Sequence, residues 1–231
     1  MLCTIADLTV SVPGAGGMES RCAQYLCETN QVADIVIRED RYDLGRWDVD
    51  SYELQCYMES GYHFYCSLLG FDGMMLHASA VELDDRAYLF SGPCGVGKST
   101  HTQLWQQAFS AAQIFNDDKP ALRCLEGRWY AYGTPWCGKN GINRNRKVLL
   151  AGICFLKQGK ENCIRRLDAK DAVNSILGQT IYRFRHVENL DLLLRHVDRL
   201  VRTVPVFEME NRPEVDAAHL SYETMFREAG L

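Results

Sequence analysis

The sequence lacks any apolar run of the roughly 20 residues needed to cross a lipid bilayer. Its first residues, 1–7, include no basic segment and carry an early acid, which is unlike a secretory signal. We therefore expect a cytoplasmic protein with no membrane partner. Hydrophobic residues make up 47% of the chain and charged residues 24%, and both proportions are those of an ordinary soluble globular protein.

A dense block of basic residues is also missing, and the formal net charge is −5. The densest basic stretch, 143–147, reads Asn-Arg-Asn-Arg-Lys and fits either a solvated loop or a local anion site. Nucleic acid is therefore not an expected partner. A homo-oligomer is compatible with this composition, which does not specify the oligomeric state.

No two cysteines are spaced as a Cys-x-x-Cys pair, so nothing indicates a zinc site. Several cysteines lie inside apolar runs, such as Cys154 in the segment 149–156. This placement is typical of small buried side chains in a reducing compartment. The ten cysteines are Cys3, Cys22, Cys27, Cys56, Cys66, Cys94, Cys124, Cys137, Cys154 and Cys163.

Strand-like and helix-like patterns alternate along the chain without an internal repeat, which predicts an α/β fold. Strand patterns at 74–81 and 86–91 flank two aspartates that suit a hairpin turn, so we expect a mixed, partly antiparallel sheet with flanking helices. Further strands are expected at 5–12, 33–38, 113–115, 121–124, 127–132, 148–157 and 204–208. Helices are expected at 18–28, 51–69, 99–109, 169–181 and 189–203, the last two closing the chain.

One loop matches the phosphate-binding pattern Gly-x-x-x-x-Gly-Lys-Ser/Thr at every fixed position, and it lies between an expected strand and an expected helix. Its glycines let the backbone curl so that N–H groups converge on phosphate oxygens, and the helix start adds its positive end. We therefore predict an ATP site. Its residues are Gly92, Pro93, Cys94, Gly95, Val96, Gly97, Lys98, Ser99 and Thr100.

The chemistry of this loop depends on two side chains. Lys98 is expected to reach the outer phosphates, and the hydroxyl of Ser99 is expected to ligate Mg²⁺. The pattern arises by chance in roughly 1% of chains of this length, so a glycine-rich turn that only caps a helix is the weaker interpretation. Cys94 occupies a variable position of the pattern, and we assign it no catalytic role.

Two adjacent acids, Asp117 and Asp118, follow the strand expected at 113–115. A P-loop kinase needs carboxylates at the end of a neighbouring strand, one for the metal and one for the proton of the attacking hydroxyl. Neighbouring residues of a strand point to opposite sides, so the two acids would do different work. The alternative is a solvated turn before Pro120, which we consider weaker because the pair follows the phosphate loop on the next strand.

Three segments together, 75–81, 88–100 and 115–118, resemble HPr kinase/phosphorylase and its small relatives. That superfamily shares its P-loop fold with phosphoenolpyruvate carboxykinase, so the resemblance implies a phosphoenolpyruvate carboxykinase-like P-loop fold. The likeness is specific over about 74–118 and weaker as far as about Lys157.

The resemblance implies the same roles for the phosphate loop, its lysine and its serine. It further implies that Asp118 is the catalytic base and that Asp117 assists the metal. His77 matches an active-site histidine of the family. Its position on a strand is equally compatible with a packed core residue.

The chain departs from the family between 133 and 147, where no acid replaces the metal-binding glutamate of HPr kinase. This weakens the case for HPr as substrate and for phosphorylase activity. The chain is more similar to divergent relatives, some of which phosphorylate serine in peptides or as a free amino acid. The loop itself is either a solvated connection or a lid whose basic side chains cover the phosphates or hold a substrate carboxylate. For this role we favour Arg144 or Arg146 over Lys139.

The sequence therefore predicts an ATP- and Mg²⁺-dependent phosphotransferase that acts on a hydroxyl of a peptide, a protein or a small molecule, and serine is the expected source of that hydroxyl. The rival hypothesis is a nucleotide-binding regulator without turnover, favoured by the missing glutamate. We divide the chain into an N-terminal α/β subdomain, 1–70, of unassigned role, and a P-loop core with C-terminal helices, 71–231.

Overall fold

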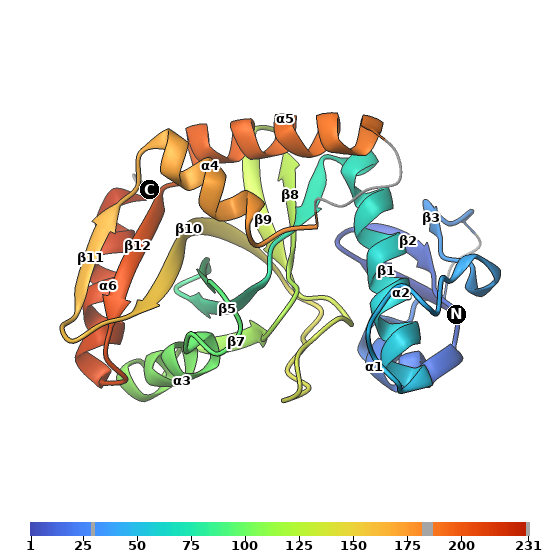
Figure 1. Cartoon of the computed structure of the whole chain (residues 1–231), viewed down its shortest axis with the longest axis horizontal. Coiled ribbons are helices and arrows are strands. Elements are labelled where there is room, and N and C mark those ends of the chain that lie inside the picture. Colours follow the sequence, from blue (N-terminus) through green and yellow to red (C-terminus); the bar gives the residue numbers. More distant parts are fainter. Residues whose placement is uncertain (29–30, 182–186, 230–231) are drawn as a thin grey trace.

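A computed structural model describes residues 1–28, 31–181 and 187–229 (Figure 1). The fold is mixed α/β, as the sequence predicts, with a curled mixed sheet flanked by helices. Within the described residues, no helix is long and apolar enough to span a membrane. The strands are β1 (Leu2–Ile5), β2 (Leu8–Ser11), β3 (Ile35–Val36), β4 (Gly73–Met75), β5 (Ala78–Leu83), β6 (Arg86–Ser91), β7 (Gln113–Asn116), β8 (Ala121–Leu125), β9 (Arg128–Tyr132), β10 (Lys147–Gln158), β11 (Cys163–Arg166) and β12 (Val206–Asn211).

The described strands form two sheets. The large sheet has the order β4-β8-β9-β10-β6-β5-β7, with β12 paired to β10 and β11 paired to β12, while β1, β2 and β3 form a small sheet of their own. In the large sheet β10 runs parallel to β6 and to β12, and the other pairs are antiparallel. The helices are α1 (Met18–Cys22), α2 (Tyr52–Leu68), α3 (Lys98–Ala108), α4 (Ala169–Leu177), α5 (Val187–Thr203) and α6 (Val215–Glu228).

Strand β5 lies between β6 and β7 and is antiparallel to both. The strands β6 and β7 therefore run in the same direction and end at the same edge of the sheet. In register, Ala78 is opposite Ser91, the last residue of β6, and its N–H donates to the carbonyl of Asp118 at 2.9 Å. The backbone thus brings the residues that follow β6 and β7 to one edge, about 10 Å apart for two strand spacings.

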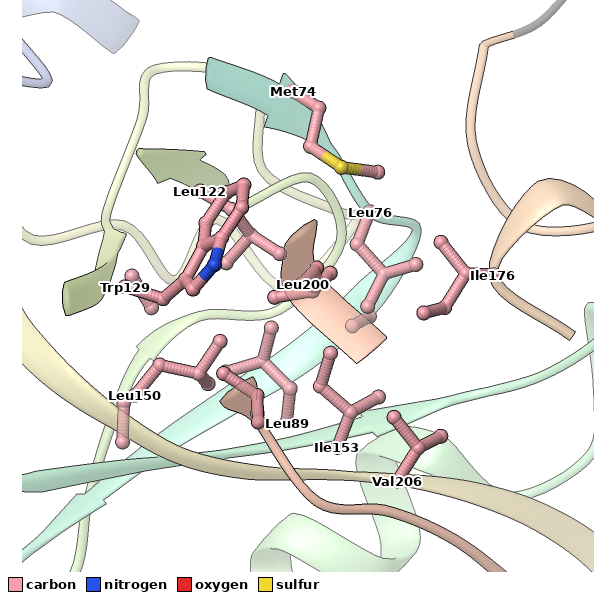
Figure 2. Packing of buried hydrophobic residues seen from close by; sticks show 14 of the residues in the cluster. Met74, Leu76, Leu89, Leu122, Trp129, Leu150, Ile153, Ile176, Leu200 and Val206 are labelled. Carbon is pink, nitrogen blue, oxygen red and sulfur yellow. The ribbon is translucent and has the colours of Figure 1, made fainter. Parts of the chain in front are cut away.

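Apolar side chains cover both faces of the large sheet. On one face, Leu89, Ile153 and Val206 of the sheet pack with Ile176 of α4 and Leu200 of α5 (Figure 2). On the other face, α3 and α6 bury a second cluster against the same strands. Figure 1 shows α5 along one side of the sheet and α3 on the other. Both helix layers therefore hold the strand ends in place.

The N-terminal part packs against the large sheet through a shared core. The long helix α2 is capped by Ser51, whose hydroxyl accepts a hydrogen bond from the N–H of Leu54 at 3.4 Å. Its buried face, which includes Phe64, packs in one cluster with Tyr132 of β9 and Trp136. Residues 1–70 hence share their core with the remainder of the chain, and a domain boundary near residue 70 stays a prediction.

The local structure differs from the sequence prediction in the N-terminal region. The single strand expected at 5–12 is a hairpin of β1 and β2, because Ala6 and Asp7 adopt positive φ angles of 54° and 58° and reverse the chain. The helix expected at 18–28 ends as an α-helix at Cys22 and continues as a short 3₁₀ turn.

Two further differences lie in the core. The strand expected at 74–81 is interrupted at Leu76 and His77, whose N–H groups donate to Pro120 and Gln179 instead of a neighbouring strand. The final helix α6 and the strand β11 were not predicted. The buried face of α6 consists of small or flexible side chains (Ala217, Ala218, Ser221 and Met225), which give a weak apolar pattern. The other expected helices and strands are present, with ends shifted by a few residues.

We expect Gly133→Ala to destabilise the fold. A Cβ at this position would lie 2.9 Å from the carbonyl carbon of Arg144 and 3.0 Å from the carbonyl oxygen of Phe115, and backbone atoms cannot rotate away. Overpacking of this kind costs about 1–3 kcal/mol of unfolding free energy, which urea denaturation measures. Gly70→Ala is the matched control, because a Cβ there has no atom within 4 Å. Equal stability of the two variants would contradict the close approach.

Candidate active site

The segment from Gly92 to Ser99 forms a loop between the end of β6 and the start of α3. Three of its glycines have positive φ angles (Gly92 136°, Gly95 80° and Gly97 108°), a region that favours glycine. A Cβ at Gly92 would lie 3.1 Å from the carbonyl oxygen of Leu156, so glycine also permits the loop to lie close to β10. The glycines of the motif are thus needed for the shape of this loop.

Lys98, the first residue of α3, is buried and turns back over the loop. Its Nζ donates to the carbonyl oxygens of Gly92 at 2.8 Å and Pro93 at 3.2 Å. Burial lowers the pKa of this ammonium group, while the negative charge of Asp118 opposes that shift. A phosphate at the loop would offer Lys98 a charged partner in place of two neutral carbonyls.

A cavity of about 580 Å³ lies beside the loop. Its walls come from the loop, from the end of β10 and from the C-terminal part of α4, and they include Phe155, Gln158, Asn174 and Ser175. Small-molecule sites usually measure about 300–1,000 Å³, so a nucleotide-sized ligand fits this space. The strands β6 and β10 are parallel and end together at this cavity. Such an edge is where α/β proteins bind ligands.

The acid pair follows β7 in a turn that the side chain of Asn116 fixes. Its Oδ1 accepts hydrogen bonds from the N–H groups of Asp118 at 3.1 Å and Lys119 at 2.8 Å. Asp117 turns toward the 133–147 loop, where its Oδ1 accepts from the N–H of Gly138 at 2.6 Å. Burial raises the pKa of Asp117, although this hydrogen bond favours the ionised form. The two carboxylates therefore have separate partners.

Asp118 is the centre of a polar cluster. One carboxylate oxygen lies 3.1 Å from Nε2 of His77, and the other pairs with the ammonium of Lys119 and accepts from the hydroxyl of Tyr57 at 3.3 Å. Burial by itself would raise the pKa of Asp118, but the hydrogen bond from His77 and the charge of Lys119 hold it well below its usual range. Asp118 is consequently an anion at neutral pH.

His77 is held from both sides. Its ring Nδ1 lies 3.1 Å from Oε1 of Gln179, and its backbone N–H donates to the backbone carbonyl of Gln179 at 2.7 Å. Its backbone carbonyl accepts from the hydroxyl of Ser91 at 2.8 Å. The ring thus links the end of β6 to the acid turn after β7. Partners at both ring nitrogens orient the imidazole toward Asp118.

A second cavity of about 310 Å³ opens on this cluster. Its polar lining includes His77, Asp118 and Lys119, and the helix α2 and Trp136 supply an aromatic wall. Gly178 and Gln179 line both this cavity and the one beside the phosphate loop. The acid cluster therefore faces a space that adjoins the candidate nucleotide cavity.

The residues expected to hold Mg²⁺ are chemically suited to it. A hard cation prefers oxygen ligands, and Ser99 in the first turn of α3 and Asp117 at the end of β7 offer a hydroxyl and a carboxylate. Among the described residues no three His, Cys, Asp or Glu side chains form a cluster that holds a metal by itself. This donor set fits an ion that takes its remaining ligands from phosphate and water.

The structure does not bring Arg144 and Arg146 to the acid pair. The guanidinium of Arg144 donates to Gln113 at 2.6 Å, and that of Arg146 pairs with Glu82 at 2.5 Å. Gln113 and Glu82 lie opposite each other at the other edge of the sheet, where β7 begins. The loop returns along β7, so its later residues are carried away from the site. A role for either arginine over the phosphates is not supported by this arrangement.

The sequence prediction missed three residues of the cluster: Tyr57, Lys119 and Gln179. Lys119 follows the acid pair directly in the sequence, but the sequence did not indicate its ion pair with Asp118. Tyr57 and Gln179 lie 61 and 102 residues from the groups they contact. Nothing in their local sequence indicates those contacts. The exposed Lys139, which we ranked below the two arginines, follows Gly138, whose N–H donates to Asp117.

The comparisons with known proteins give little beyond this geometry. No protein-family model matches the chain, and no curated protein matches it either. Among solved structures, the HPr(Ser) kinase/phosphatase from Coxiella burnetii is similar at 14% identity, covering 66% of this chain and 93% of that one, with a TM-score of 0.38. A likeness this distant carries no information about activity.

We expect the ionised Asp118 to stabilise the fold at neutral pH. Its pKa is lowered in the folded state, so its stabilising contribution is present above its unfolded pKa of about 3.9 and is lost as the pH falls through the lower folded value. The stability difference between the wild type and Asp118→Asn is therefore expected to shrink between pH 5 and pH 2 in urea denaturation. Asp50→Asn, at an exposed position, is the control. A difference that does not change with pH would contradict the ion-pair assignment.

Proposed function

We propose that the protein is an ATP- and Mg²⁺-dependent phosphotransferase that acts on a hydroxyl group. The observation that carries the proposal is the junction of two cavities. One adjoins the glycine loop and the other contains Asp118, and the two share Gly178 and Gln179. A hydroxyl in the second cavity would approach the outermost phosphate of a nucleotide in the first, with an ionised carboxylate beside it.

In the proposed reaction the acceptor oxygen forms a bond to the γ-phosphorus while the bond from that phosphorus to the β–γ bridging oxygen breaks, and ADP leaves. The hydroxyl proton passes to the carboxylate of Asp118. His77 and Lys119 orient this carboxylate through the contacts described above. Lys98 neutralises charge on the transferred group, and bound Mg²⁺ would supply further charge neutralisation at the phosphates.

The low pKa of Asp118 is compatible with this role. Phosphoryl transfer passes through a loose transition state, in which the hydroxyl becomes acidic only as its bond to phosphorus forms. A carboxylate that is ionised at all working pH values can orient the hydroxyl from the start and accept its proton late. The ionised state of Asp118 matters more here than its basicity.

A second candidate function is nucleotide binding without turnover, as in a regulatory protein. The segment 133–147 favours it, because it contains no acid and so offers no further carboxylate for a metal. The paired Asp118 and His77 favour the enzyme, since a protein that only binds nucleotide has no need of an ionised carboxylate at a second cavity.

We expect Lys98→Ala to weaken ATP binding and to abolish transfer. The loss of one charged contact to the phosphates costs about 2–4 kcal/mol of transition-state stabilisation. Titration calorimetry measures the affinity, and Lys160→Ala, which removes an exposed lysine in the β10–β11 connection, is the matched control. ATP affinity equal to that of the wild type would remove the loop from the proposal.

We expect Asp118→Asn to slow single-turnover transfer from labelled ATP by about 10²–10⁴-fold, the usual contribution of a general base. The amide is nearly isosteric, so the affinity for ATP changes far less than the rate. The assay offers hydroxyl compounds and serine peptides as acceptors. Unimpaired transfer in the variant would exclude Asp118 from the mechanism, and ATP binding with no transfer to any acceptor by the wild type would favour the regulatory protein.

A further inference from the structure

The lining, charges and volume of the second cavity indicate which kind of molecule binds there. We propose that it is the acceptor pocket and that it selects a hydroxyl carried by a compact, uncharged aromatic or other apolar group. This inference rests on the proposed phosphotransferase function and adds the chemical class of the acceptor. The wall formed by α2, the charges inside the cavity and its volume each support it.

One face of α2 forms most of the apolar wall. Tyr57, Gly61 and Tyr65 are spaced at four-residue intervals, and Met58 and Tyr62 repeat the same interval one position later. Residues four apart lie above one another on a helix, so these five residues make one continuous surface. Three of them are tyrosines, and the hydroxyl groups of Tyr57 and Tyr65 are hydrogen-bonded to Asp118 and to the carbonyl of Lys119.

Two tryptophans complete this wall, and the fold fixes both. Trp136 packs so closely on α2 that a Cβ at Gly61 would lie 2.9 Å from its ring, and its Nε1 donates to the hydroxyl of Ser60 at 3.0 Å. Trp47 donates from Nε1 to the buried carboxylate of Glu59 at 2.8 Å, and Arg46 pairs with the same carboxylate at 3.3 Å. The aromatic wall is thus built before any ligand binds, which lowers the entropic cost of binding.

Within the part of the chain that the structure describes, the charges at this cavity leave no free cation for an acidic acceptor. Among the described residues that line it, the charged side chains are Asp118 and Lys119, and they pair with each other. Lys119 also donates to the hydroxyl of Tyr57 at 2.9 Å and lies over its ring. A carboxylate or phosphate on the acceptor would have to break this pairing, whereas a neutral group leaves it intact.

The volume limits the size of the occupant. At about 310 Å³ the cavity lies at the lower end of the usual range of about 300–1,000 Å³ for ligand sites. It therefore takes one compact group, either a small apolar alcohol or an apolar side chain next to a serine in a peptide. Both sources present the same chemistry to the wall and to Asp118.

The test compares apolar acceptors with charged ones. The peptides are N-acetyl-Phe-Ser-amide, N-acetyl-Asp-Ser-amide and N-acetyl-Lys-Ser-amide, and the small molecules are 2-(4-fluorophenyl)ethanol and free serine. We expect kcat/KM to be at least tenfold higher for the apolar acceptor than for the charged ones, either among the peptides or between the two small molecules. The set that shows this preference tells whether the acceptor is a peptide or a small alcohol. Equal or better transfer to the charged members of both sets would overturn the inference and leave the phosphotransferase standing.

A pair of variants tests the wall itself. Met58 lines the cavity and is half-buried, so Met58→Glu places a carboxylate in the pocket, while Met58→Leu keeps an apolar side chain of similar size. We expect Met58→Glu to raise KM for the preferred acceptor at least tenfold, and Met58→Leu to change it by less than about threefold. A KM that both variants leave at the wild-type value would overturn the inference. ATP affinity, measured by calorimetry, reports whether each variant is folded.

Direct binding separates the pocket from the reaction. The ¹⁹F NMR signal of 2-(4-fluorophenyl)ethanol broadens when the compound binds, whether or not ATP is present. We expect broadening with the wild type and with Met58→Leu, and much less with Met58→Glu. Binding of this kind without transfer to any acceptor would refute the proposed function and retain the pocket. Absence of both broadening and preference for apolar acceptors would refute the pocket.

Discussion

The position of the site depends on one backbone arrangement, the antiparallel pairing of β5 with β6 on one side and β7 on the other. Because β6 and β7 then run in the same direction, the glycine loop and the acid turn are forced to the same edge of the sheet. The hydrogen bond from the N–H of Ala78 to the carbonyl of Asp118 extends this pairing past the end of β7. His77, directly before Ala78, is carried to the same edge and meets Asp118 there.

Residues 1–70 gain a role from this arrangement. Their helix α2 packs on the large sheet through a core shared with Tyr132 and Trp136, and the face it turns to the acid cluster lines the second cavity. The cavity beside the glycine loop, in contrast, is lined by the part of the chain after residue 90. In the proposed function, the core supplies the donor site and the N-terminal part supplies much of the acceptor site.

The sequence predicted those features that depend on neighbours in the chain. The glycine loop, with its strand before and helix after, is a local pattern, and so is the hairpin at Asp84 and Asp85. The sequence did not predict the contact of His77 with Asp118; a family resemblance implied only that each residue belongs to the active site, and their catalytic roles stay predictions. Tyr57 and Gln179 were missed because tertiary packing, not spacing, places them. The contact of Arg144 with Gln113 was not predicted, because the return of its loop along β7 has no sequence signal.

The central claim is that the glycine loop and Asp118 belong to one site for phosphoryl transfer. A crystal structure with Mg²⁺ and a non-hydrolysable ATP analogue tests it most directly. The account predicts phosphates on the loop, Lys98 withdrawn from the carbonyl oxygens of Gly92 and Pro93 to contact them, and the terminal phosphate directed at the cavity that contains Asp118. A terminal phosphate directed away from that cavity, or a nucleotide bound elsewhere, would contradict it.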